Sequence, residues 1–102
     1  MNDVYEIAVD QIALFQCAGY NPNGGTADPT GPIVWVMEPK NILAVEPLNE
    51  SGRDVSVMGA EIGEGILTAF APAGKQTLTD MVRIRVVASQ IARIKIITTP
   101  PQ

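Results

Sequence analysis

The clearest pattern in the chain is a strict alternation of apolar and charged residues toward its C-terminal end. In Val82–Val86 the apolar side chains share one face and the cations the other, and Ala92–Ile96 repeats the pattern. A period of two is typical of a half-buried strand. We expect residues 87–91 to close a hairpin between the two strands. Its outer face would carry four cations, Arg83, Arg85, Arg93 and Lys95.

Short apolar runs separated by Gly, Pro, Asn and Asp fill most of the remaining chain, and no segment keeps a helical period. The other predicted strands are Tyr5–Val9, Ile12–Gly19, Ile33–Met37, Asn41–Glu46, Asp54–Met58 and Gly65–Ala71. About seven to nine strands of this length predict an all-β sandwich or barrel. At 102 residues the chain has room for one domain and one core.

Several single positions have an expected structural role. Trp35 lies in the most continuous apolar strand and is predicted to be a core residue. Cys17 is expected to be a small buried side chain. Gly63 and Gly65 suit a tight turn or a close approach of two backbones. The Asn/Pro/Gly segment 20–31 is predicted to be an exposed loop.

Three pieces of the chain, taken in order, resemble a bacterial immunoglobulin-like domain of the group 2 type. They are Val34–Val45 with its strand tryptophan, Val55–Gly59 followed by Gly63–Ala69, and Met81–Val87. The resemblance covers roughly residues 10–88 and implies an immunoglobulin-like β-sandwich for the single domain 1–102. The chain departs from the family's outline in the loop 20–31, an insert at 47–53, an extra strand at about 91–97 and a frayed tail, 98–102.

Composition narrows the function classes. The net charge of −4 argues against nucleic acid as a partner, because phosphate binding needs a clustered positive surface. The acids concentrate in residues 1–52 and the bases in residues 53–102. Such a dipolar chain could pack head to tail with copies of itself, or the charges could simply be solvated strand faces. No stretch is long and apolar enough for a membrane span.

The residues for common catalytic and metal sites are scarce. The chain has no histidine and one cysteine, which excludes histidine-dependent triads and a thiolate zinc site. Glu61 and Glu64 lie in the glycine-containing turn 59–65, where a solvated role is expected. Asp28, Asp54 and Glu61 lack the spacing of a calcium loop. We therefore expect no catalytic residue, no cofactor and no bound metal.

Two functional hypotheses follow, both non-enzymatic. Domains of the resembled family usually occur in tandem in exported proteins, whereas this chain begins with Met1 and lacks an apolar leader. The first hypothesis is therefore a phage virion accessory protein, a capsid decoration or cement protein or a tail ornament, made in the host cytoplasm. It would act through protein contacts as a homo-oligomer or within a larger assembly.

The second hypothesis is an adhesion or carbohydrate-binding module on a cell surface, with recognition in loops 20–31 and 47–53. In the first, the four cations would meet an acidic surface of a neighbouring copy or of a capsid shell. They could equally serve only to keep an edge hairpin soluble.

Overall fold

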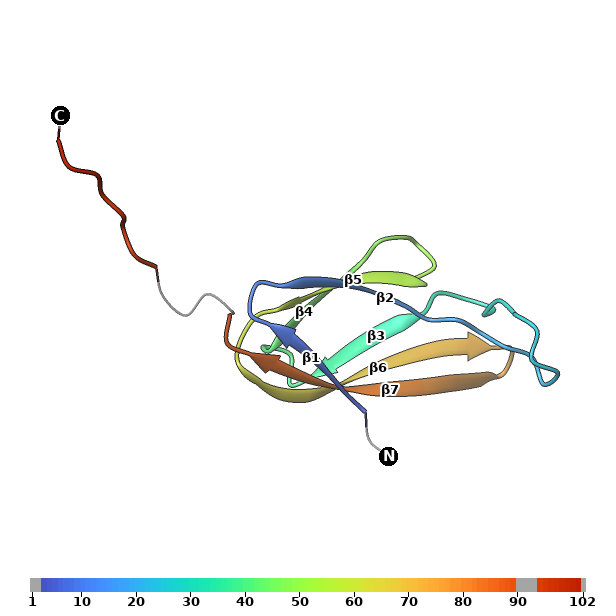
Figure 1. The fold of residues 1–102 in the computed structure, drawn as a ribbon. Helices are drawn as coiled ribbons and strands as arrows, with labels where there is room; N and C mark the ends of the chain where they lie inside the picture. The colour runs from blue at the N-terminus through green and yellow to red at the C-terminus, as the bar shows by residue number, and fades with distance from the viewer. Residues whose placement is uncertain (1–2, 90–93, 102) are drawn as a thin grey trace.

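Two β-sheets pack face to face to form the body of the protein (Figure 1). The computed structural model describes residues 3–89 and 94–101. Within these residues there are seven strands and no helix. The strands are β1 (Val4–Ala8), β2 (Ile12–Gln16), β3 (Val34–Glu38), β4 (Leu43–Pro47), β5 (Asp54–Gly59), β6 (Gly63–Ala73) and β7 (Gln76–Val87).

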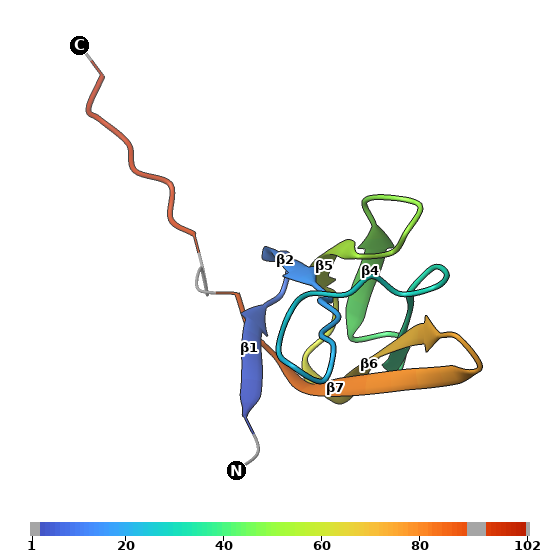
Figure 2. The same cartoon turned by 90° about the vertical axis from the view of Figure 1, so that its right-hand side faces the viewer.

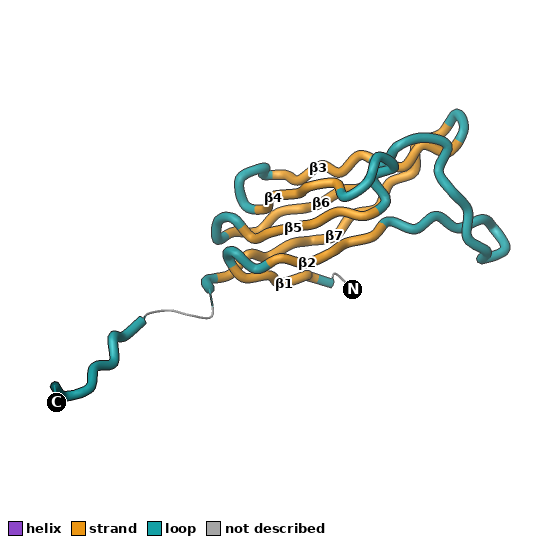
Figure 3. The backbone as a smooth tube through the Cα atoms, turned by 90° about the horizontal axis from the view of Figure 1, so that it is seen from above, coloured by secondary structure: helices purple, strands orange, loops and turns teal. Residues whose placement is uncertain are grey.

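The strand order is that of an immunoglobulin-like sandwich, which confirms the predicted fold class. One sheet has the order β1-β7-β6-β3 and the other the order β2-β5-β4. Figures 2 and 3 show the two layers from the side and from above. β1 lies parallel to β7, with Val4–Ala8 opposite Arg83–Val87, while the other strand pairs are antiparallel.

β1 and β2 belong to different sheets although only three residues separate them. Asp10 makes the crossing with a φ of 68°, a left-handed conformation that Asp tolerates better than most residues. Its amide donates to the carbonyl of Gly59 in β5 (2.8 Å), and Val9 N donates to the carbonyl of Val87 (2.9 Å). The crossing is therefore tied to both sheets.

The core lies between the sheets and is aliphatic, in keeping with a sequence in which only 5% of the residues are aromatic. Its most deeply buried side chains alternate along their strands and come from both layers: Ile7, Val55, Val57, Leu67, Ile84 and Val86. Removing such branched side chains from water is the main favourable term in folding, at roughly 25 cal/mol per Å². Trp35 and Phe15 are half-buried and pack against this cluster.

Trp35 lies at the border of the core and not at its centre. Its indole N–H donates a 2.6 Å hydrogen bond to the carbonyl of Gly52. The turn that contains Gly52 is itself fixed, because Ile33 N donates to Ser51 O (2.7 Å) and Arg53 N to the side chain of Asn49 (3.1 Å). The insert predicted at 47–53 is thus an ordered turn that covers one end of the sandwich.

Gly52 and Gly65 occupy positions that only glycine fits. Gly52 has a φ of 70°, and a Cβ there would overlap the carbonyl oxygen of Ile33. A Cβ on Gly65 would overlap Glu38 O and Met37 Cε, which confirms the close approach expected at this glycine. Segment 20–31 forms no strand apart from one bridge between Tyr20 and Thr26, and most of it is exposed, as predicted.

The prediction of a strand near 91–97 is wrong for the part that the structure describes. Residues 94–97 form no strand, and residues 90–93 lie outside the described residues. The hairpin that does form joins β6 to β7. The other side of β7 is paired with β1 over Arg83–Val87, so the place expected for the extra strand is already filled. Residues 98–101 have no regular structure, in line with the predicted tail.

Replacement of Trp35 tests its role at the border of the core. Trp35→Ala is expected to lower the free energy of unfolding by about 3 kcal/mol, because it leaves a cavity and an unpaired carbonyl. Trp35→Phe keeps most of the packing and should cost about 1 kcal/mol, the value of the hydrogen bond to Gly52. Urea denaturation measures both values. Equal losses for the two variants would contradict the assigned hydrogen bond.

Gly52→Ala is expected to destabilise the protein by about 3 kcal/mol or more, because it adds a backbone overlap to an unfavourable φ. Gly74→Ala is the matched control. Gly74 has a φ of 66°, but a Cβ at this position would have no atom within 4 Å, so this variant should lose only about 1 kcal/mol. Thermal and urea unfolding of both variants check the difference. A similar loss for each would show that the contact with Ile33 contributes little.

Candidate interaction surfaces

The outer face of the four-stranded sheet carries two of the four predicted cations. Arg83 and Arg85 alternate with buried Ile84 and Val86 along β7, as expected. Arg85 lies between two acids on neighbouring strands, with its Nε 2.7 Å from Glu64 and its Nη1 3.9 Å from Glu6. The hydrogen bond to Glu64 raises the pKa of Arg85. Its charge is therefore already compensated within the chain.

Of the other two predicted cations, the structure describes only Lys95, which is not on this face. Lys95 belongs to the C-terminal segment 94–101, which runs away from the sheets in Figures 1 and 2. Arg93 lies outside the described residues. Among the described residues, the expected face therefore holds Arg83 and Arg85, and β1 occupies the edge of β7 beside them.

The same outer face also carries exposed aliphatic side chains. Val34 and Val36 come from β3, Ile66 from β6 and Met81 from β7, with exposed fractions between 38% and 64%. Register places them around Thr68, which is opposite Val36 on one side and Met81 on the other. We call these four residues the outer patch. Contiguous exposed apolar side chains commonly mark protein-binding surfaces.

Sequence reasoning missed the outer patch, although a signal was present. Segments 33–37 and 65–71 are apolar at nearly every position and do not alternate. That pattern is typical of strands buried on both faces. In the isolated chain only the inner face of each strand is covered.

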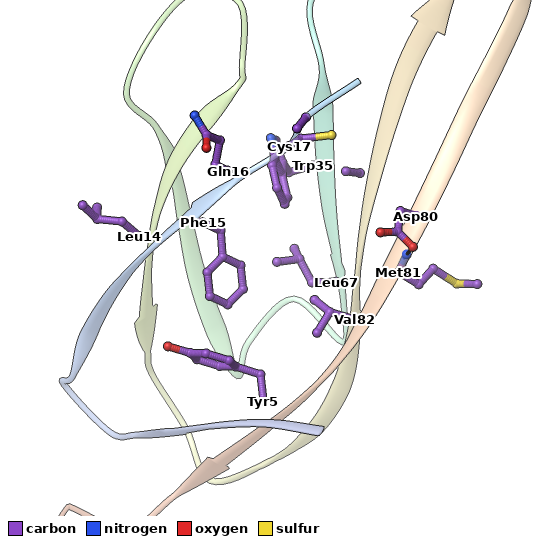
Figure 4. Close-up of a pocket in the computed structure, with 12 residues that line it drawn as sticks. Tyr5, Leu14, Phe15, Gln16, Cys17, Trp35, Leu67, Asp80, Met81 and Val82 are labelled. Carbon is purple, nitrogen blue, oxygen red and sulfur yellow. Dashed lines mark hydrogen bonds between the residues drawn. The ribbon is translucent and has the colours of Figure 1, made fainter. Parts of the chain in front are cut away.

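A groove opens along one side of the sandwich, between β2 with the residues that follow it and the first half of β7. Its larger part has a volume of about 420 Å³, and an adjoining part that shares Cys17, Ala18, Ala69 and Asp80 adds about 250 Å³. In Figure 4 the side chains of Phe15, Trp35, Leu67 and Val82 surround the larger part, while Met81 points away from it. Tyr5 closes one end with an edge-to-face contact to Phe15 at 4.8 Å between ring centroids.

The groove runs beside an unpaired length of strand. β1 covers β7 only over Arg83–Val87, and no described residue pairs with the other edge of residues 76–82. The carbonyl of Val87 points to this edge, because it accepts a hydrogen bond from Val9 N. Alternate residues of a strand direct their backbone groups the same way, so the N–H and C=O groups of the other odd-numbered residues of β7 also point to this edge. One of them, the amide of Met81, donates instead to the carboxylate of Asp80 (3.0 Å).

The acids considered for chemistry take part in local contacts. Glu61 accepts from Asn41 (2.7 Å) and Asp54 from Asn49 (2.8 Å), while Asp28 lies 3.9 Å from Arg53. Among residues 3–89 and 94–101, no group of three or more Cys, Asp or Glu side chains is placed to hold a metal ion. That part of the chain also contains no helix of the length and apolarity needed to cross a bilayer.

No protein-family model and no curated protein matches the sequence. The architecture and the two surfaces are therefore the basis for a functional proposal.

Cys17 provides a chemical probe of the groove, because its half-buried side chain lines both parts. Burial, and secondarily the nearby charge of Asp80, raises the pKa of its thiol. Alkylation by iodoacetamide should therefore reach half its maximal rate at a higher pH in the folded protein than in urea. Asp80→Asn should lower that midpoint only in part.

The sign for stability follows from the same shift. The pKa of the Cys17 thiol is higher in the folded than in the unfolded protein. Its contribution to the free energy of unfolding is therefore fully present below the unfolded-state pKa, and it is lost as the pH rises through the folded-state pKa. Identical alkylation profiles in buffer and urea would contradict the burial of Cys17.

Proposed function

We propose that the chain is a non-enzymatic structural protein that acts through protein–protein contacts within a larger assembly. The observation that carries this proposal is the outer patch, Val34, Val36, Ile66 and Met81, exposed on adjacent strands of one sheet. Burial of these side chains against a partner would favour binding, by roughly 25 cal/mol for each Å² of apolar surface removed from water. The surface of a sheet is also flat and rigid, which suits a partner with a preformed surface.

Arg83 supports the same surface. It is opposite Ile66 on β6 and borders the outer patch, and the described residues show no acid in ion-pair contact with it. A cation at the rim of an apolar contact chooses and orients a partner more than it adds affinity. The partner would then carry an apolar area with an acid beside it.

Within this proposal the specific setting is a phage virion, where the chain would decorate or cement a capsid or ornament a tail. Its support is the resemblance to bacterial immunoglobulin-like domains of the group 2 type. A carbohydrate-binding module is less well supported. Loops 20–31 and 47–53 contain a single aromatic residue, Tyr20, for stacking on sugar rings.

Charge placed in the outer patch should prevent incorporation into the assembly. Val36→Lys/Ile66→Lys is expected to lower the occupancy of the chain on purified particles of the encoding phage by at least about tenfold, a loss of about 1.4 kcal/mol. The matched control is Ile62→Lys, which changes an exposed side chain in the turn before β6 and should keep full occupancy. Co-sedimentation with quantitative mass spectrometry measures the occupancy.

Thermal unfolding of both variants establishes that they remain folded. Absence of the wild-type chain from purified particles would refute the virion setting. Equal occupancy of the patch variant and the control would refute the role of the outer patch.

A further inference from the structure

The C-terminal segment contains apolar side chains that the rest of the described chain leaves uncovered. Ile94, Ile96 and Ile97 are 86%, 83% and 87% exposed. They belong to the alternating stretch Ala92–Ile97, in which Ile94 and Ile96 share one side and Lys95 and Ile97 the other if the chain is extended. The composition of this stretch is typical of a β-strand. In the described part, residues 94–97, it is not paired with a sheet.

The groove offers what this segment lacks, an unpaired sheet edge beside an apolar surface. The edge of β7 at residues 76–82 offers backbone donors and acceptors with no described strand against them. Side chains at alternate positions of a strand added there would point between the sheets, toward Trp35 and Leu67. The carboxylate of Asp80 now meets one of these donors, Met81 N. An added strand would supply that acceptor from its own backbone.

Charge also favours this pairing. All eleven acids of the chain lie in residues 1–89, with five bases, whereas residues 90–102 carry two bases and no acid. Among the described residues, Asp80 is the one charged side chain that lines the two parts of the groove. A cationic apolar segment is therefore drawn to an anionic apolar groove.

A neighbouring copy can supply this segment more readily than the chain itself. The chain leaves β7 at Val87, and β1 covers the edge from Val87 back to Arg83. To reach its own open edge, the segment would have to pass over β1 with residues 88–93 almost fully extended, a reach of roughly 20 Å. A second copy has no such constraint, and in Figure 1 the segment points away from its own sheets.

We propose that residues 94–97 of one copy add as a strand along residues 76–82 of β7 in a second copy, with Ile94 and Ile96 in the groove. The contact uses two different surfaces of the chain, so it can continue from copy to copy and form open chains of molecules. It shares Met81 with the outer patch, but through the backbone of that residue and not through its side chain, which points away from the groove. The proposal stands independently of the function proposed above.

Variants of the full chain test which side of the segment enters the groove. Sedimentation velocity should show the average mass of the wild-type protein rising with concentration. Ile94→Ser/Ile96→Ser should abolish the rise. Ile97→Ser is the matched control, equally exposed but on the other side, and should retain it. Val36→Lys/Ile66→Lys should also retain it, which separates this contact from the outer patch.

Alkylation of Cys17 reports on the groove directly. In the wild-type protein its rate should fall about tenfold when roughly nine-tenths of the grooves are filled, and Ile94→Ser/Ile96→Ser should remove this protection. A synthetic peptide with the sequence of residues 92–98 should restore protection to that variant. The proposal is overturned if association persists in Ile94→Ser/Ile96→Ser, or if Cys17 reacts equally at all concentrations. Protection that depends on Ile94 and Ile96 but not on concentration would place the segment in its own groove, and would likewise overturn it.

Discussion

The mismatch in length between β1 and β7 determines which parts of this sandwich are closed and which are open. β7 has twelve residues and β1, its parallel neighbour, has five. Where β1 is present, the inner side of β7 is sealed and Ile84 and Val86 are almost completely buried. Where it is absent, Val82 is only half-buried and Leu78 is exposed. The groove, its open edge and the accessible side of Trp35 all follow from that difference.

An open side in a small domain requires reinforcement elsewhere, and the turn 48–53 provides part of it. Gly52 allows this turn to lie directly against β3, where its carbonyl accepts from Trp35 and its neighbour Ser51 accepts from Ile33. The next residue, Arg53, accepts from Cys17 N at 2.9 Å, which holds the chain beyond β2 beside the groove. One wall and the floor of the groove are thus both hydrogen-bonded to the same turn.

Local pattern located each of the seven strands because a strand needs an apolar inner face, and this requirement is visible in the sequence. It missed the first half of β7, since the predicted Val82–Val86 is only part of Gln76–Val87. The predicted Asp54–Met58 differs from β5 by one residue. The apolar and polar pattern gave a wrong prediction where two segments could pair with the same edge of a strand. Ala92–Ile96 alternates as clearly as Val82–Val86, yet residues 94–96 form no strand, because β1 lies on the edge beside Arg83–Val87. A parallel pair between the two ends of the chain leaves no local signal.

The candidate surfaces also combine features that local spacing predicts with features that depend on distant strands. Arg83 and Arg85 could be assigned to one face from their spacing, but the compensation of Arg85 by Glu6 and Glu64 depends on two other strands. The groove depends on the ends of β1 and β2, and strand ends are the least visible feature of a sequence.

An open edge is a hazard for a β protein, because any extended chain can pair with it. Asp80 limits that hazard here. Its carboxylate binds the exposed amide of Met81 and places a negative charge where an incoming strand must lie. Any incoming strand would have to displace that carboxylate from the Met81 amide. A neutral or acidic strand would not be attracted by the negative charge of Asp80, whereas a strand that carries cations would be. The residue that protects the edge from unselective pairing is thus also the one that favours Ala92–Ile97. Specificity at such an edge comes from the charge, while most of the affinity comes from the isoleucines, since exposed ion pairs contribute at most about 1 kcal/mol each.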